Sequence, residues 1–270
     1  MTLLQAIILG IVQGATEFIP VSSNAHLVLI PWLLGWPPSG MIFDTVIHWG
    51  TLLAVVSFFW QELVSIFKNV IRDLVNRTPL ASAESRLGWM LVVATLPAVI
   101  LGLLFEEIIE GILSEPVWVA ASLMVTGLIL WVSESIGNRT RPVGALTFTD
   151  ALMIGLAQAV ALVPGISRSG STIGAGLARG LERPAAARFS FLMMVPIVFG
   201  AGLLKLFDAI EVGMSEEGMM MVFAGLIAAA ISGYLCVTLL LRYLATQSVR
   251  SFAVYCWLFG GLCVLIALFP

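Results

Sequence analysis

Charged residues are scarce in this chain, and their scarcity limits its class. Lys, Arg, Asp and Glu make up 11% of the 270 residues, whereas a soluble domain usually carries about 25%. Hydrophobic residues make up 60% of the chain, and the mean hydropathy is +1.05. These values exclude an ordinary soluble protein, and we expect an integral membrane protein in contact with lipid.

Cysteine and N-terminal basic residues are also lacking. The chain has 3 Cys, all in apolar runs, and none shows the spacing of a zinc site or of a disulfide framework. The first apolar run starts at Thr2 without a basic stretch before it, and no small-residue cleavage site lies near Pro20. We therefore expect this run to be part of the fold and not a signal peptide.

Apolar runs long enough to cross a bilayer recur along the chain. A membrane helix needs about 20 apolar residues. The runs predict an all-α polytopic membrane protein with six transmembrane helices. The predicted spans are residues 41–67, 87–105, 116–134, 187–207, 219–241 and 251–269.

Two further apolar segments are broken by polar turns. Residues 2–36 are interrupted by Pro20 and a Ser-Ser-Asn-Ala-His group, and residues 149–181 are interrupted by Pro164 and the turn after it. Each half is too short to cross the bilayer comfortably. Irregular backbone at membrane depth must line a cavity or be buried in protein. We therefore predict two re-entrant helix-loop-helix hairpins.

The two interrupted segments resemble each other. An Ala-x3-Gly-x2-Gln pattern occurs in residues 6–13 and again in residues 151–158, and a Pro and then a Ser follow in both. This indicates an internal repeat, with one hairpin and three spans in each half. We predict a single membrane domain, residues 1–270, whose repeat halves are about 1–140 and 145–270.

The basic residues predict how the halves are oriented. If the 68–86 loop is cytoplasmic, the alternation of spans puts every Lys and Arg on that side except Arg168 and Lys205, as the positive-inside rule requires. Three spans per half is an odd number, so the second half is inverted. The two hairpins then enter from opposite sides, and we expect their tips to meet near the midplane.

The second polar turn, residues 164–172, reads PGISRSGST. An arginine at membrane depth is costly unless it has an anionic partner. A guanidinium fork, hydroxyl donors and the N–H groups that open a helix together suit a phosphate. The predicted phosphate-binding residues in this turn are Arg168, Ser167, Ser169, Ser171 and Thr172.

The first polar turn brings different chemistry. Gln13 and Glu17 are four residues apart and share a helix face. Ser22 or Ser23 is a suitable N-cap for the following helix, and we expect His26 on the same face as the serines. An acid, an amide, hydroxyls and an imidazole around one turn could supply a base, a nucleophile and ligands for phosphate or metal.

Non-catalytic interpretations stay open for the same residues. Glu17 could be a helix-end carboxylate, and His26 could be a buried core histidine. Gln13 could bridge helices, and Arg168 could be a structural counter-ion to Glu17. His48 follows the start of a predicted span and precedes a tryptophan, which favours an interfacial position.

Both turns resemble motifs of the undecaprenyl-diphosphate phosphatase family, the bacitracin-resistance type. Residues 13–23, QGATEFIPVSS, are similar to its [E/Q]xxxE signature with the following FxPVSS, and residues 164–172 match its PGxSRSxxT signature. The resemblance covers essentially the whole chain. It implies hydrolysis of C55-prenyl diphosphate to the monophosphate and inorganic phosphate, which recycles the lipid carrier for peptidoglycan synthesis and confers bacitracin resistance.

The resemblance also implies roles for single residues. Glu17, Ser23, His26 and Arg168 would be catalytic, and Ser22 would join the phosphate-binding set. Mg²⁺ or Ca²⁺ would be held by Glu17 with Gln13, although Gln replaces the Glu that some members have there, so a two-carboxylate metal site is missing. The nucleophile stays open between Ser23, His26 and water.

The resemblance implies location and partners as well. The protein would lie in the bacterial inner membrane, with its site open to the outer side. Its partners would be a prenyl diphosphate lipid and membrane lipid, not nucleic acid. Small-xxx-small stretches such as Gly225 to Ala229 allow a homodimer. A lipid-phosphate transporter or flippase is the rival interpretation, because inverted repeats with broken helices are typical of transporters.

Overall fold

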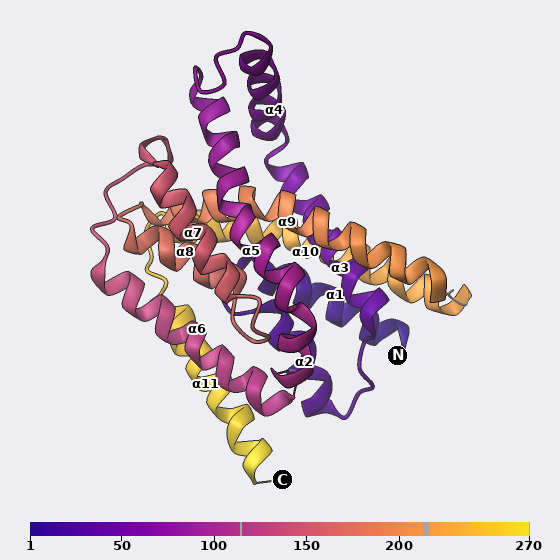
Figure 1. Cartoon of the computed structure of the whole chain (residues 1–270). Helices are drawn as coiled ribbons and strands as arrows, with labels where there is room; N and C mark the ends of the chain where they lie inside the picture. Colours follow the sequence, from indigo (N-terminus) through magenta and orange to yellow (C-terminus); the bar gives the residue numbers. More distant parts are fainter. Residues whose placement is uncertain (114, 213–215, 270) are drawn as a thin grey trace.

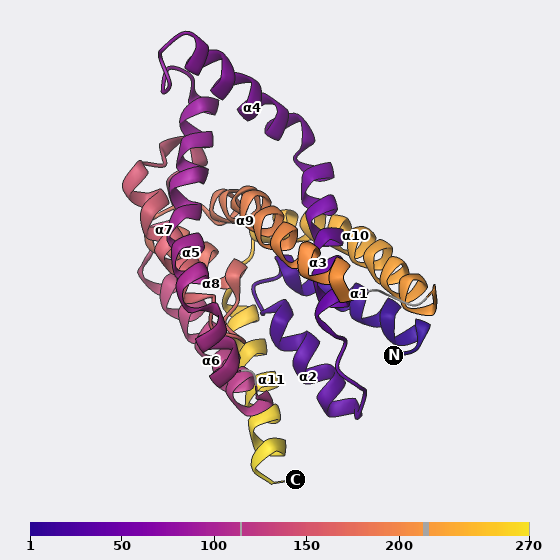
Figure 2. The ribbon, with the colours of Figure 1, turned by 45° about the vertical axis from the view of Figure 1, so that its right-hand side comes forward.

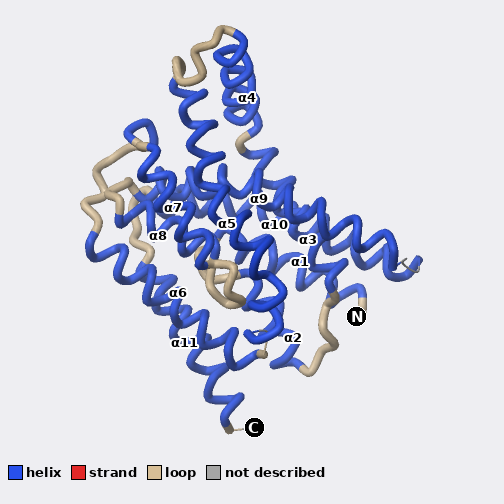
Figure 3. Tube along the Cα trace, in the orientation of Figure 1, coloured by secondary structure: helices blue, strands red, loops and turns tan. Residues whose placement is uncertain are grey.

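The computed structural model describes the backbone of residues 1–113, 115–212 and 216–269, and their side chains except at 106–113, 205–212 and 216–217. The described secondary structure is helical (Figures 1 and 3). One isolated bridge joins Arg141 and Leu181. Lys205, an exception in the charge pattern, lies outside the described side chains.

Six helices are long and apolar enough to cross a membrane, which confirms the predicted all-α polytopic class. The six are α3 (Met41–Phe58), α5 (Ala83–Leu113), α6 (Pro116–Ile136), α9 (Arg183–Val212), α10 (Glu216–Leu244) and α11 (Arg250–Leu268). In five of them the apolar stretch lies within about one helical turn of the predicted span, although α5 and α9 continue beyond it.

The predicted span 41–67 is wrong at its C-terminal end. Helix α3 ends at Phe58, and a separate helix, α4 (Trp60–Val75), follows. Glu62, Lys68 and Arg72 alternate with apolar residues in α4, and such an amphipathic helix is costly inside hydrocarbon. Helix α4 and the turn after it project from the other helices (Figure 2).

Both interrupted segments form the predicted helix-loop-helix hairpins. The first contains α1 (Leu3–Phe18) and α2 (Ser23–Leu34), and the second contains α7 (Phe148–Val160) and α8 (Arg168–Ala178). Their first helices each begin with a capping box, and a serine side chain caps each second helix. Such caps satisfy backbone N–H groups that a helix start leaves without partners. A 3-10 turn, η1 (Val143–Ala145), precedes α7.

The hairpins pack against the opposite halves of the chain. Helix α1 lies along α10, and α7 lies along α5, while α3 contacts α9 and α6 contacts α11. Gly10 and Gly155, which match in the repeat, both allow a close backbone approach: a Cβ would lie 2.4 Å from the Gly225 carbonyl oxygen in one case and 2.4 Å from that of Ala94 in the other. This reciprocity is what an inverted repeat predicts. The division into halves stays a prediction.

Candidate functional site

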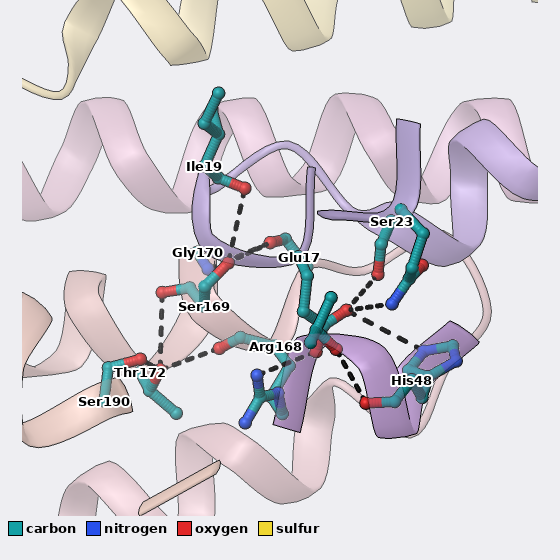
Figure 4. A network of polar contacts seen from close by, with 12 residues as sticks. Glu17, Ile19, Ser23, His48, Arg168, Ser169, Gly170, Thr172 and Ser190 are labelled. Carbon is teal, nitrogen blue, oxygen red and sulfur yellow. Dashed lines mark hydrogen bonds and ion pairs between the residues drawn. The ribbon is translucent and has the colours of Figure 1, made fainter. Parts of the chain in front are cut away.

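The polar turns of the two hairpins meet, as the inverted arrangement predicts. Arg168, the first residue of α8, donates from Nη2 to Glu17 Oε1 at 2.9 Å. The Ser169 hydroxyl donates to the carbonyl oxygen of Ile19, just after α1, at 3.4 Å. The side chain of Glu17 is 6% exposed and that of Arg168 is 18% exposed. The two turns therefore form one buried polar cluster (Figure 4).

Glu17 is the centre of this cluster. Its Oε2 accepts a hydrogen bond from the Ser23 hydroxyl at 2.5 Å and another from Gln13 Nε2 at 3.1 Å. Figure 4 shows Ser23, His48 and Arg168 converging on the carboxylate from three directions. A hydroxyl that donates to a buried carboxylate is placed to lose its proton to that carboxylate when it attacks.

His26 contacts the same turn, but the structure does not bring it to this carboxylate. The His26 ring stacks on Tyr255 and Phe259 of α11. Its Nε2 lies 2.7 Å from the Tyr255 hydroxyl, and its Nδ1 lies 2.8 Å from the Ser22 carbonyl oxygen. Packing against α11 turns the ring away from Glu17. A catalytic role for His26 stays a prediction.

His48 takes the place beside the carboxylate instead. Its Nε2 lies 3.8 Å from Glu17 Oε2, and its Nδ1 donates to the Asp44 carbonyl oxygen at 2.6 Å. The interfacial interpretation from sequence missed this contact. The signal available was the presence of an ionisable residue inside a predicted span, which is a site hypothesis by itself.

The predicted phosphate-binding hydroxyls divide into two groups. Ser22, Ser167 and Ser169 line the cavity between the hairpin turns. Thr172 Oγ1 lies 2.6 Å from Ser190 Oγ and binds helix carbonyls. Ser171 Oγ is buried, and neither it nor Thr172 lines that cavity.

Some buried polar atoms of the site have no partner among the described residues. Besides Ser171 Oγ, these include Arg168 Nη1 and Gln13 Oε1. Buried polar groups in native proteins are nearly always satisfied, so each exception calls for an explanation. A donor on Arg168 and an acceptor on Gln13 are what a bound phosphate and a bound cation would use.

The site cavity has polar and apolar compartments. A pocket of about 210 Å³ lies between the two turns and includes Glu17, Ser23 and Arg168. It shares Asn24, His48, Val198 and Ala201 with a larger cavity of about 820 Å³. That cavity is lined mainly by apolar side chains of α2, α3 and α9, including Leu27, Val28, Trp32, Met41 and Val198. The pair of compartments fits a molecule with a polar head and an apolar tail.

The metal prediction is only partly matched by the donors present. Glu17 and the unpartnered Gln13 Oε1 lie in one helix turn. Among the residues that the structure describes, no group of three or more His, Cys, Asp or Glu side chains is placed to hold an ion. Mg²⁺ commonly takes one or two carboxylates and completes its shell with phosphate oxygens and water. The donor set fits an ion of that kind and not an all-protein cage.

The fold and cluster define a polytopic helical membrane protein with a buried acid, hydroxyl and guanidinium at the junction of two hairpins. The family described as "Bacitracin resistance protein BacA" matches residues 6–262, and the chain belongs to that family. Similar curated proteins are named undecaprenyl-diphosphatase. One from Thermomicrobium roseum is 42% identical over 276 residues and covers 100% of this chain and 99% of its own. One from Chlorobaculum tepidum is 46% identical over 275 residues, with 98% of each chain covered.

Proposed function

We propose that this protein is an undecaprenyl-diphosphate phosphatase. It hydrolyses undecaprenyl diphosphate to undecaprenyl phosphate and inorganic phosphate, which returns the lipid carrier to peptidoglycan synthesis and confers bacitracin resistance. The observation that carries this proposal is the contact of Ser23, Glu17 and Arg168 at the junction of the hairpins. The names of the relatives supply the substrate.

The two compartments suit the two parts of this substrate. The diphosphate occupies the polar pocket, and the prenyl chain extends into the larger apolar cavity. Arg168 Nη1 binds a phosphate oxygen while Nη2 holds Glu17. Hydroxyls of Ser167 and Ser169 and the N–H groups that begin α8 complete the phosphate site, because helix N-termini and charge-assisted bonds favour anions.

Ser23 is the nucleophile that the geometry favours among the three candidates. Its oxygen attacks the terminal phosphorus while Glu17 Oε2 takes the hydroxyl proton. The bond from that phosphorus to the bridging oxygen breaks, and undecaprenyl phosphate leaves. Water then hydrolyses the phosphoserine to give inorganic phosphate and free Ser23. His26 is a weaker candidate, because both of its ring nitrogens are engaged away from the pocket.

A divalent cation, when bound by Glu17 and Gln13 Oε1, would neutralise part of the phosphate charge. The protein's own residues position the diphosphate for attack. Phosphoryl transfer depends mainly on positioning and charge stabilisation, and these are what Arg168, the hydroxyls and the buried pocket provide.

The rival function is transport of a lipid phosphate without hydrolysis. A transporter needs an anion site and an apolar pathway, but it has no use for a hydroxyl held on a carboxylate at 2.5 Å. That contact favours hydrolysis. We further propose that the pocket opens to the outer side of the inner membrane, because the larger cavity reaches Met41 and Pro116, at the ends of α3 and α6 opposite the 68–86 loop in the predicted orientation.

Phosphate release from undecaprenyl diphosphate tests the proposal. The purified wild type is compared with the Glu17→Ala and Arg168→Ala variants, with Mg²⁺ and with EDTA, alongside a flipping assay in vesicles. Release by the wild type and its loss in both variants are expected. Lipid flipping without phosphate release by the folded wild type would show that the function is transport and not hydrolysis. Labelling of a Ser23→Cys thiol by an impermeant reagent from the cytoplasmic side alone would contradict the outward opening.

A further inference from the structure

The turn between α1 and α2 contains a strained residue directly before the proposed nucleophile. Ser22 has φ 65° and ψ 97°, a left-handed backbone conformation that is rare for a residue with a side chain. Such conformations persist only where surrounding contacts hold them, and they gather at functional sites. The contacts that hold Ser22 therefore also determine where the Ser23 hydroxyl points.

His26 supplies two of those contacts. Its backbone N–H donates to the Ser22 carbonyl oxygen at 3.3 Å, and its Nδ1 lies 2.8 Å from the same oxygen. A carbonyl oxygen can only accept, so Nδ1 carries the ring proton. Nε2 of the neutral ring is then an acceptor. It lies 2.7 Å from the Tyr255 hydroxyl, which donates to it.

Helix α11 packs against this turn. The Tyr255 ring lies nearly parallel to the His26 ring, with 5.7 Å between centroids and 7° between planes. Phe259 stacks on His26 at 5.1 Å, and Cys256 Sγ lies 3.9 Å from the Pro20 carbonyl oxygen. Tyr255 is 42% exposed. The Tyr255 ring packs on the His26 ring, whereas its hydroxyl forms a hydrogen bond with His26 Nε2.

We propose that Tyr255 is a positioning residue for the hydrolysis. Its hydroxyl fixes the tautomer and orientation of His26, His26 holds the Ser22 carbonyl group, and Ser23 is thereby kept on Glu17. This inference rests on the proposed function. Neither Tyr255 nor His26 lines the polar pocket, so both act through Ser23 and not by touching the phosphate.

The kinetic test uses Tyr255→Phe, which removes one oxygen and keeps the stacked ring. We expect kcat to fall about tenfold, because a small displacement of a reacting group is enough for such a loss, and KM to stay unchanged. Tyr243→Phe is the matched control, because it removes a hydroxyl that lies 2.7 Å from Ser251 Oγ, outside both hairpins. The control should keep the wild-type kcat, and both variants should keep the wild-type melting temperature.

A spectroscopic test reads the proposed link directly. The chain has 2 His, so protein labelled with ¹⁵N-histidine gives signals from His26 and His48 alone, and a His48→Gln sample assigns them. In the wild type we expect His26 to be protonated on Nδ1, with a hydrogen-bonded Nε2. In Tyr255→Phe the Nε2 signal should move, and a second tautomer should appear.

Three outcomes would overturn the inference. These are an unchanged kcat in Tyr255→Phe, a fall in kcat accompanied by a rise in KM, and a fall in kcat with unchanged His26 signals. Failure of the proposed function is distinguishable, because the wild type itself would then release no phosphate. The His26 signals would still decide whether the Tyr255 contact sets the tautomer.

Discussion

The Arg168 guanidinium reaches the Glu17 carboxylate at 2.9 Å across 151 residues of sequence, and it leaves Nη1 buried and without a partner in the described structure. One guanidinium can hold a carboxylate and a phosphate at the same time, because its donors form a planar fork. Lysine keeps the charge but not the fork. Arg168 joins the two hairpins through Nη2, and in the proposed function it binds substrate through Nη1.

We expect Arg168→Lys to lower kcat/KM about 100-fold, in line with the loss of one donor to a developing anion. Phosphate release over a range of substrate concentrations measures this. Lysine is preferred to alanine here, because leaving the Glu17 charge buried and unpaired would cost about 3–5 kcal/mol of stability. If kcat/KM of Arg168→Lys stayed within twofold of the wild-type value, Arg168 would not be a phosphate-binding residue.

Ser23→Ala should abolish phosphate release, because the hydroxyl on Glu17 is the proposed nucleophile. Acid quenching of the wild type during turnover should trap a phosphoserine that the variant lacks. Ser133→Ala is a suitable control, since Ser133 is also buried and its hydroxyl donates only to a carbonyl oxygen of its own helix. Measurable turnover by Ser23→Ala would point to water as the nucleophile.

Local sequence patterns were enough to predict the hairpins and much of the site. Pro20 and Pro164 break the apolar segments, and serine caps restart the helices. Because both turns are short, the residues within them were already confined to a small volume. The odd number of spans predicted that the two tips meet, whereas the pairing of Glu17 with Arg168 was one of the alternatives left open.

The partners of the two histidines were not predicted, because the positions of these side chains depend on packing between distant helices. Helical spacing predicts which residues share a face, but it does not say which helix that face meets. His26 lies on the face of α2 that contacts α11, and α3 carries His48 to α1. The early end of α3 was missed for a different reason, because the hydropathy of the segment did not separate a span from the amphipathic α4.

His48 should contribute to turnover although no motif includes it. Its Nε2 lies 3.8 Å from Glu17 Oε2, and its side chain lines both compartments of the cavity. We expect His48→Ala to lower kcat/KM about tenfold, equivalent to about 1.4 kcal/mol. Asn69→Ala in α4, which removes a polar side chain that binds Ser65 of its own helix, is the control. Equal kcat/KM values for His48→Ala and Asn69→Ala would show that His48 does not contribute to turnover.

We expect Gln13 to determine how strongly a cation is held at the proposed site. Its Oε1 is buried without a partner in the described structure, and its Nε2 donates to Glu17. Gln13→Glu supplies a second carboxylate, so the Mg²⁺ concentration for half-maximal activity should fall about tenfold, because carboxylate oxygens are preferred ligands of Mg²⁺. Titration of EDTA-treated protein with Mg²⁺ measures this. An unchanged Mg²⁺ concentration for half-maximal activity would show that Gln13 does not bind the metal.

Asp150 at the start of α7 anchors the second hairpin at a distance from the proposed phosphate site. It is fully buried, and its carboxylate lies 2.7 Å from both Arg141 Nη2 and Arg179 Nε. Burial acts to raise the pKa of this carboxyl group. Hydrogen bonds from Arg141, Arg179 and Thr147 outweigh burial and hold the pKa well below its ordinary value of 3.8.

A carboxyl group whose pKa is lowered by folding stabilises the protein above its unfolded pKa, about 3.9, and the contribution is lost as the pH falls below that value. Asp150→Asn should therefore lower the free energy of unfolding by about 2 kcal/mol at neutral pH. The difference from the wild type should stay constant from about pH 7 to 5 and shrink below about pH 4. Glu115→Gln, at an exposed carboxylate, should show no such difference. Denaturant unfolding in detergent at several pH values measures all three proteins, and a difference that shrank already between pH 7 and 5 would contradict a lowered pKa.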